Sequence, residues 1–219
     1  MDEMIRKKIS DGREYRMMTM APVEEDRQVV EGYATTFEQK YDLYSYEDSK
    51  GRHTVREMVS RDAFKEADMR DVIMQYDHQG RVFARLSNGT LELEEDEHGL
   101  KVRANLGGTE IGRQLYEEIQ GGYTNKMSFG FTIAEDNIVP DGPDYIRTIK
   151  RIGKLFDVSA VSLPANDFTE ISARSHIDGV IEEIEAERLQ AEEEARRKEQ
   201  EWEALMKRIE ALKGEEHGN

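Results

Sequence analysis

NKMSFGFTI, residues 125–133, alternates between large apolar side chains and small ones. Odd-numbered positions carry the large groups, such as Phe129 and Phe131, and even-numbered positions carry small groups, such as Ser128 and Gly130. Because successive side chains of a β-strand point to opposite faces, this alternation predicts a strand with one face in a core. Two interpretations of the small face stay open: a shelf on which a hydroxyl meets backbone or substrate, or a half-exposed face in water.

Short β-rich segments bounded by turns make up most of the first part of the chain. Asn-Gly and Gly residues favour the positive φ angles of tight turns, so 87–89 and 96–99 predict β-hairpins and 139–144 predicts another turn. In addition to 125–133, the segments predicted to be strands are 29–37, 72–78, 90–96, 100–106 and 145–163.

Two helices are predicted between these strands. Segment 60–68 begins at Ser60, a residue type that caps helix N-termini, and segment 109–122 begins at Thr109 and ends at two glycines. Many antiparallel strands with few helices predict a mainly β, α+β fold: an antiparallel β-barrel, or alternatively a compact sandwich, with flanking helices packed outside it.

A change of composition near residue 174 marks a second region. Residues 175–219 are rich in charged side chains, and apolar residues recur there at alternating steps of three and four, as in a coiled-coil seam that is weak at Arg188 and Lys198. A coiled-coil or docking helix and a solvated single helix both fit this pattern. The predicted organisation is an N-terminal tail (1–13), a β-barrel domain (14–174) and a long charged C-terminal helix (175–219).

Composition and charge exclude several classes of function. The chain of 219 residues has a formal net charge of −16 and no cysteine. The charge argues against nucleic acid as a partner, since phosphate binding needs clustered Lys and Arg, and the lack of cysteine excludes disulfides and a thiol nucleophile. The N-terminus shows no apolar signal region, and no stretch approaches the ~20 apolar residues that cross a bilayer. We expect a soluble, intracellular protein with no membrane partner.

Familiar catalytic and metal-binding motifs are missing. The sequence contains no phosphate-binding loop, zinc-protease motif or nucleophile elbow, and its five histidines lack metal-ligand spacing, so no metal or other cofactor is expected. Hydrolytic chemistry would then rest on a serine hydroxyl. Such a hydroxyl needs a neutral imidazole to accept its proton and a third group to orient that imidazole.

His78 is the candidate for the imidazole. It ends segment 72–78 beside a glycine turn, where packing can hold the ring while solvent still reaches it. The alternative is a partly buried structural histidine bonded to a carbonyl. Asp77 is a weak candidate for its orienting group, because neighbouring residues of a strand face opposite ways.

Asp157 is the candidate for the third group. It lies inside the apolar segment 145–163, where a carboxylate is costly unless it is paired. Alternatively, Asp157 has no catalytic role and forms a salt bridge with Lys154 or Arg151.

Four parts of the sequence follow one another in a recognisable order. They are VIMQYDHQGRVFARLSNGTLELEEDEHGLKVRANL (72–106), a predicted helix, KMSFGF (126–131) and LFDVSAVSLPAN (155–166). Together they resemble the prohead (head maturation) serine proteases of tailed bacteriophages, a family related in fold to the herpesvirus assembly proteases. The similarity covers residues 14–174.

The resemblance implies a serine endopeptidase that cuts scaffold segments from capsid proteins inside an immature shell. Matched block by block, it implies Ser128 as nucleophile, His78 as base and then acid, and Asp157 as third member, where many members of the family carry glutamate. The oxyanion would be bound by backbone N–H groups near Gly80 or Arg81.

The resemblance also implies partners and a location. The expected partners are the major capsid protein precursor and its scaffold segment, a homo-oligomer is expected, and the expected location is the immature phage prohead in the host cytoplasm. Self-cleavage is expected between about 170 and 190, where the composition changes. The alternative is a non-enzymatic capsid assembly or scaffolding protein with a β binding domain and a helical tail, since scaffolding segments are often helical and acidic.

Overall fold

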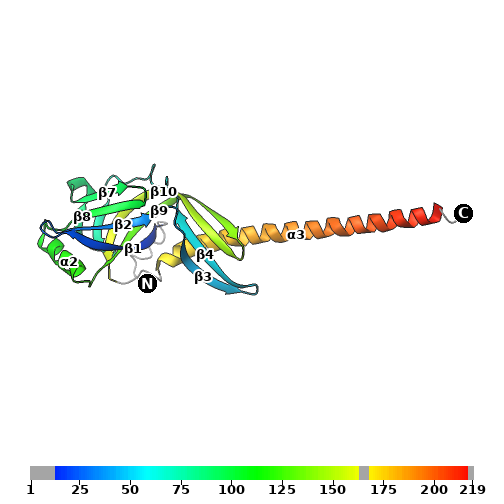
Figure 1. Cartoon of the computed structure of the whole chain (residues 1–219), viewed down its shortest axis with the longest axis horizontal. Helices are drawn as coiled ribbons and strands as arrows, with labels where there is room; N and C mark the ends of the chain where they lie inside the picture. The colour runs from blue at the N-terminus through cyan, green and yellow to red at the C-terminus, as the bar shows by residue number, and fades with distance from the viewer. Residues whose placement is uncertain (1–12, 163–167, 217–219) are drawn as a thin grey trace. The chain divides into compact units, whose positions relative to one another are not determined.

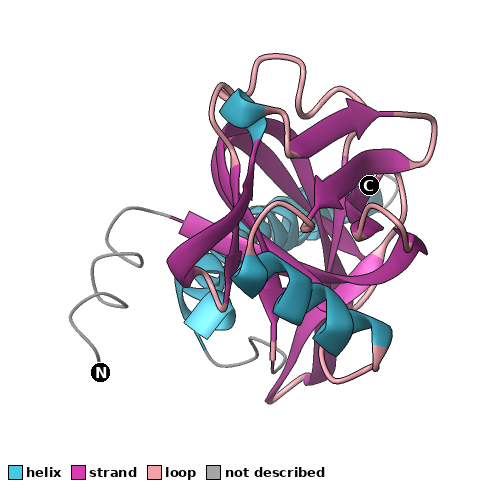
Figure 2. Cartoon of the chain, turned by 90° about the vertical axis from the view of Figure 1, so that its left-hand side faces the viewer, coloured by secondary structure: helices cyan, strands magenta, loops and turns pink. Residues whose placement is uncertain are grey.

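A computed structural model describes residues 13–162 and 168–216 of the chain. The chain divides into two compact units, which are residues 1–174 and residues 175–219. Strands dominate the first unit (Figure 2). They are β1 (Arg13–Glu24), β2 (Val29–Thr36), β3 (Tyr41–Asp48), β4 (Gly51–Val59), β5 (Ile73–Tyr76), β6 (Gln79–Arg85), β7 (Leu91–Glu95), β8 (Gly99–Asn105), β9 (Lys126–Asp141) and β10 (Asp144–Val161).

One sheet contains all of these strands. Its main path runs β3-β4-β10-β9-β1-β2-β8-β7, and Figure 1 labels these strands. Off this path, β5 pairs with β10, and β6 pairs with β5. The mainly β prediction is confirmed, but the predicted barrel is not, because the end strands β3 and β7 do not pair and the sheet is not closed. The expectation of a purely antiparallel sheet is also wrong, since β10 pairs in parallel with β4 and with β5.

The length of β10 explains the branch. One edge of this strand pairs with β9, whereas the other edge pairs first with β4, over residues 145–149, and then with β5, over residues 157–160. Both parallel neighbours reach β10 through connections much longer than a hairpin turn, as parallel pairing requires. The branch therefore brings the end of β5 beside the C-terminal part of β10.

Every segment predicted to be a strand contains one, but β5 ends at Tyr76, so Asp77 and His78 form a turn instead of ending the strand. The sequence pattern does not predict β1, β3, β4 or β6. In β1 and β4 the buried positions include Glu14, Arg16 and Glu57, and these charges hide the apolar alternation.

The predicted helix at 109–122 is confirmed as α2 (Glu110–Gln120). Thr109 caps it by accepting a hydrogen bond from the backbone N–H of Gly112 at 3.1 Å. Leu115 and Ile119 are buried against the sheet's apolar core, and Figure 2 shows α2 lying across the strands.

The predicted helix at 60–68 is wrong. Its backbone forms successive tight turns, in which Ala63 N–H donates to Ser60 O at 3.0 Å and Ala67 N–H donates to Phe64 O at 2.9 Å. The carbonyl of Ala63 accepts instead from the N–H of Ile152 in β10 at 2.8 Å. A tertiary hydrogen bond thus takes the acceptor that a helix would need.

All three predicted turns occur, but the hairpin predicted at 87–89 is wrong, because β6 and β7, which this turn joins, do not pair with each other. Two of the turns have a glycine with the positive φ that glycine favours. A short 3-10 helix, η1 (Leu86–Asn88), leads to Gly89 at φ 71°, and Gly142 at φ 67° joins β9 to β10. At 96–99 the side chain of Asp96 accepts from the backbone N–H of His98 at 2.7 Å.

The helix α3 (Phe168–Glu216) begins before the unit boundary, and its residues from 175 onward belong to the second unit. The predicted C-terminal helix is therefore confirmed, and it exposes Leu189, Trp202 and Leu205. Among the described residues, no helix is long and apolar enough to cross a membrane. The coiled coil stays a prediction. The predicted tail at 1–13 lies outside the described residues except for Arg13, which begins β1.

Candidate active site

The register between β9 and β10 puts Ser128 and Asp157 on one face of the sheet. Ser128 lies directly opposite Ser159, and Gly130 lies directly opposite Asp157. Residues opposite each other in neighbouring strands point to the same face, as do residues two apart in one strand. A third residue reaching this face can therefore contact both predicted site residues.

His78 reaches this face from the turn after β5. Its Nδ1 lies 2.5 Å from Oδ1 of Asp157, and its Nε2 lies 2.8 Å from Oγ of Ser128. The three side chains singled out by sequence thus meet in one hydrogen-bonded chain, although 79 positions separate His78 from Asp157. These two contacts favour the predicted triad over a purely structural histidine.

This hydrogen-bonded chain is shielded from solvent. Ser128 is 1% exposed and Asp157 is 4% exposed, while the side chain of His78 is 10% exposed. The half-exposed interpretation of the small face of β9 is therefore wrong. A buried carboxylate that accepts from Nδ1–H fixes the tautomer in which Nε2 can take the proton of the serine hydroxyl.

The alternative partners of Asp157 are engaged elsewhere. Nζ of Lys154 lies 3.7 Å from the carboxylate of Asp68, and Nη1 of Arg151 lies 3.2 Å from that of Glu66. The salt-bridge alternative is therefore wrong.

Ser159 joins the site although the sequence analysis gives it no role. Its Oγ donates to Oδ1 of Asp157 at 2.6 Å, and the residue is fully buried. The same carboxylate oxygen therefore bonds both Ser159 and the His78 imidazole. The only sequence signal for this contact is the two-residue spacing, which puts Ser159 on the face of Asp157.

Gly130 allows a close approach across β9. A Cβ at this position would lie 2.8 Å from Oδ2 of Asp157 and 2.8 Å from the ring of Tyr15. That ring packs edge-on against the His78 imidazole, with centroids 4.3 Å apart. Any larger side chain at 130 would push the carboxylate or the ring away from the imidazole.

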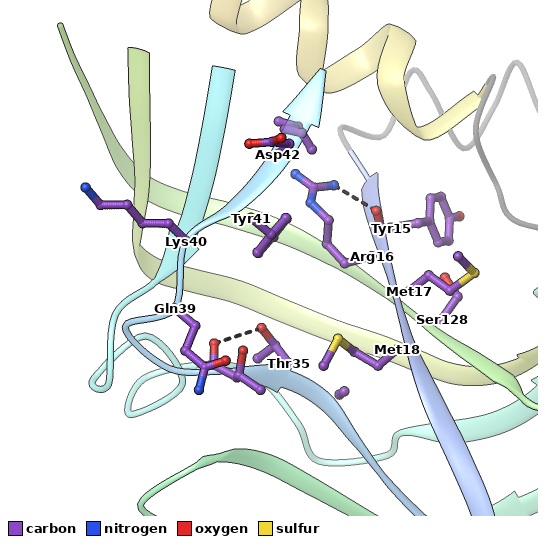
Figure 3. Close-up of a pocket in the computed structure, with 13 residues that line it drawn as sticks. Tyr15, Arg16, Met17, Met18, Thr35, Gln39, Lys40, Tyr41, Asp42 and Ser128 are labelled. Carbon is purple, nitrogen blue, oxygen red and sulfur yellow. Dashed lines mark hydrogen bonds between the residues drawn. The ribbon is translucent and has the colours of Figure 1, made fainter. Parts of the chain in front are cut away.

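A cleft of about 400 Å³ opens beside Ser128 (Figure 3). It lies where β1 and β2 separate: β1 pairs with β2 only from Met20 onward, while Arg13 to Thr19 pair with β9. Met17, Thr35 and Lys40 are among its lining residues. The cleft therefore borders the buried serine.

Arg16 and Tyr41 also line the cleft, and both bind Glu57. Nε and Nη2 of Arg16 donate to the two oxygens of Glu57 at 2.5 and 2.7 Å. Arg147 donates to Glu14 at 2.8 and 2.9 Å and to Glu57 at 3.1 Å. We call Glu14, Arg16, Glu57 and Arg147 the buried charge cluster, because each is at most 9% exposed.

Mutual pairing favours the charged forms of Glu14, Arg16 and Arg147 through their pKa values. Burial alone would raise the pKa of Glu14, but the charge of Arg16 and the hydrogen bonds from Arg147 outweigh it and hold that pKa below its usual value. Burial would likewise lower the pKa of Arg16, and the charge of Glu57 raises it well above the usual value instead. Burial and the neighbouring Glu57 raise the pKa of the Tyr41 hydroxyl.

Two other predictions concern metal and oxyanion binding. Within residues 13–162 and 168–216, no group of three or more His, Cys, Asp or Glu side chains could hold a metal ion. Gly80 and Arg81 line a second cavity of about 520 Å³ beside α2, whereas Ser128 lines the cleft beside β1. The assignment of the oxyanion donors stays a prediction.

Comparison with known proteins identifies relatives of the chain. The model of the caudovirus prohead serine protease family matches residues 15–182. A prohead protease of Enterobacteria phage HK97 is 33% identical over 159 residues, which cover 69% of this chain and 62% of that protein. The match therefore spans less than two thirds of the relative's length. No solved structure matches the chain.

Proposed function

Because the chain belongs to the caudovirus prohead serine protease family, we propose that it is a serine endopeptidase with Ser128, His78 and Asp157 as its catalytic triad. One observation carries the assignment of residues: the imidazole of His78 bonds the serine hydroxyl through Nε2 and the carboxylate through Nδ1. This is the arrangement that turns a weakly nucleophilic hydroxyl into an attacking group.

The proposed reaction follows from the atoms in contact. Oγ of Ser128 attacks the scissile carbonyl while Nε2 of His78 takes its proton, and Asp157 stabilises the imidazolium that forms. His78 then gives the proton to the leaving amine, which departs as the peptide bond breaks and an acyl-enzyme remains. Water attacks this ester with His78 again as base, and the release of the carboxylic acid restores Ser128.

The cleft beside β1 is the proposed seat of the substrate. Met20 N–H donates to the carbonyl of Asn125, the residue directly before β9, so alternation along β1 turns the backbone N–H and C=O of Met17 away from β9, toward the cleft. An extended peptide could pair with this edge of β1 as an added strand. Such pairing would place the peptide in the cleft next to Met17, which lies directly opposite Ser128. The scissile bond would then have to reach across β1 to meet the hydroxyl, since neighbouring strands lie about 4.8 Å apart.

The proposed substrates are the major capsid protein precursor and its scaffold segment, cut inside the immature prohead in the host cytoplasm. In this scheme residues 14–174 form the protease domain, residues 1–13 an N-terminal tail and residues 175–219 a helical tail, and the active form is a homo-oligomer. Self-cleavage between about 170 and 190 is part of the proposal. Because α3 covers this region, such a cut requires local unwinding of the helix.

A non-enzymatic assembly or scaffolding protein is the second candidate. The observation that favours it is α3, a long charged helix that exposes Trp202, Leu205 and Met206, side chains suited to a partner helix. The two candidates differ in one measurement: a scaffold leaves capsid precursor uncut, whereas the proposed protease cuts it and loses this activity with Ser128.

A serine-directed fluorophosphonate followed by peptide mapping tests the proposal. We expect the label on Ser128. Ser128→Ala should abolish labelling and lower kcat on a capsid-precursor peptide by about 10⁴ to 10⁶, because the triad acts as a unit, with an unchanged Tm. The control is Ser45→Ala, which removes an exposed hydroxyl bonded to Thr54 and should change neither readout. Labelling at another serine, or equal losses from both variants, would contradict the assignment.

A further inference from the structure

The turn that carries His78 has an unusual backbone. Asp77 has a φ of 48° and His78 a φ of 56°, in the left-handed region that residues with a Cβ rarely occupy. These two residues join β5 to β6, and Tyr76 pairs with Gln79 across them. Two consecutive left-handed residues in a two-residue hairpin are the signature of a type I′ turn, in which Asn-Gly is preferred.

The sequence Asp-His does not by itself favour this turn. Asp tolerates left-handed backbone better than most residues, but His stands where the turn prefers glycine. Such strained positions persist only where their surroundings hold them, and they concentrate at functional sites. The structure must therefore contain contacts that fix the turn.

Asp77 supplies these contacts. Its backbone N–H donates to Ala160 O at 2.8 Å. Its carboxylate accepts twice from Ser162, with Oδ1 2.9 Å from the backbone N and Oδ2 2.8 Å from Oγ. Both oxygens thus bind the end of β10, so Asp77 does not take the orienting place that Asp157 holds.

The imidazole depends on this anchor for its direction. His78 must bond Ser128 with one nitrogen and Asp157 with the other, and both bonds are fixed by the direction of its Cα–Cβ bond. If the turn relaxed to φ below zero, this bond would swing and both contacts would break. β10 carries Asp157 and leads directly into Ser162, to which the turn is anchored, so the acid and the base are both positioned by this strand.

We propose that Asp77 is a positioning residue: its carboxylate clamps the type I′ turn to Ser162 and so aims His78 at Ser128 and Asp157. The inference rests on the proposed function and extends it to a residue outside the triad. It separates two roles of Asp77, tolerance of left-handed backbone and acceptance of hydrogen bonds from Ser162. Substitutions can test these roles one at a time.

Three variants at Asp77 make the test. Asp77→Asn keeps an acceptor for the N–H of Ser162 and tolerates left-handed backbone, so kcat should stay within about threefold of wild type. Asp77→Gly fits the turn but loses the clamp, so kcat should fall by about 10- to 100-fold because the imidazole is misplaced. Asp77→Ala loses both features and should fall furthest. KM should change little in all three, since Asp77 does not line the cleft.

A second readout is independent of turnover. The proton on Nδ1 of His78 should give a downfield NMR resonance in wild type and Asp77→Asn, and a weakened or shifted one in Asp77→Gly. Gln28→Gly is the matched control, because Gln28 also has a left-handed backbone, with φ 54°, in a turn away from the site. It should change neither kcat nor this resonance.

The outcomes separate the clamp from the proposed function. If Asp77→Gly keeps wild-type kcat and the wild-type resonance while Ser128→Ala is inactive, the clamp is wrong and the protease assignment stands. If Asp77→Asn falls as far as Asp77→Ala, acceptance from Ser162 is not what matters, and the clamp is again wrong. If wild type neither cuts peptide nor takes the fluorophosphonate, the proposed function itself fails.

Discussion

Each face of β1 lies beside a set of polar side chains, and the two sets differ in how they are hydrogen-bonded. On one face, Glu14 and Arg16 lie opposite Phe131 and Phe129 of β9 and belong to the buried charge cluster. On the other face, Tyr15 and Met17 lie opposite Gly130 and Ser128, beside the candidate triad. The same pair of strands thus supports a set of fixed ions on one side and a reactive hydroxyl on the other.

The difference lies in how the hydrogen bonds are arranged. In the charge cluster, Arg16 bonds Glu57 twice and Glu14 once, and Arg147 bonds Glu14 twice, which forms a closed mesh. In the triad, single bonds run in a line from Asp157 through His78 to Ser128, and the last hydroxyl borders the cleft. A mesh resists change because every charge has several partners, whereas a line can pass a proton along and meet a substrate at its end.

Asp157→Asn should have the largest effect, because it breaks the hydrogen-bonded chain of the triad and leaves the buried charge cluster intact. An amide can donate to Nδ1 and so stabilise the wrong tautomer of His78, and kcat should fall by about 10⁴. The fluorophosphonate labelling rate should fall in parallel, and Tm should change little. A variant that keeps full activity would show that the carboxylate is not part of the mechanism.

Glu57→Ala should break the mesh and lower the free energy of unfolding by about 3–5 kcal/mol, because Arg16 and Arg147 would be left as uncompensated buried charges. Denaturant unfolding measures this. The matched control is Glu66→Ala, which removes an exposed ion pair with Arg151 and should cost no more than about 1 kcal/mol. Equal losses from the two variants would mean that the buried cluster is not a special source of stability.

Ser159→Ala should sharpen the comparison with a smaller effect. It removes one of the two bonds to Oδ1 of Asp157, and a hydrogen bond to a charged group contributes about 1.5–3 kcal/mol. If all of this is lost from the transition state, kcat should fall by about 10- to 150-fold. Ser159→Thr, which keeps the hydroxyl, should recover part of the activity. A loss as large as that of Ser128→Ala would instead make Ser159 a candidate nucleophile.

Acid should weaken the mesh through Glu14, and this is the smallest effect. The pKa of Glu14 is lower in the folded protein than its usual value of 4.5, so its ionised form contributes stability that is fully present above pH 4.5 and is lost as pH falls through the folded pKa. Glu14→Gln should have a lower Tm at pH 7 and a flatter decline of Tm below pH 4.5. A parallel decline in both proteins would contradict this role.

Local patterns were enough to predict part of the molecule. The alternation in 125–133, the Thr109 cap and the turn glycines act over a few residues, so strand β9, helix α2 and the turns follow from them. Long-range contacts overrode local signals elsewhere. The N–H of Ile152 donates a hydrogen bond to the carbonyl of Ala63, so turns form where a helix was predicted. Buried Glu57 makes the sequence of β4 look polar, so this strand was not predicted.

The three candidate catalytic residues were identifiable from their local surroundings: His78 ends a predicted strand beside a glycine turn, and the other two are polar groups in apolar strands. Ser128 is a hydroxyl on a strand of large apolar groups, and Asp157 is a carboxylate in an apolar segment. The roles proposed for them came from the resemblance to a family, since residue spacing does not reveal which distant side chains meet.

Sequence by itself determined the β-rich character, the charged C-terminal helix and the three residues worth testing, because periodicity, charge and rare polar positions are written along the chain. Tertiary structure alone decided that the sheet stays open, that Ser159 binds Asp157 and that Asp77 binds Ser162. These depend on the register between β5, β9 and β10, which one-residue shifts would change completely. Register is fixed by the packing of the whole sheet, and no short stretch of sequence contains it.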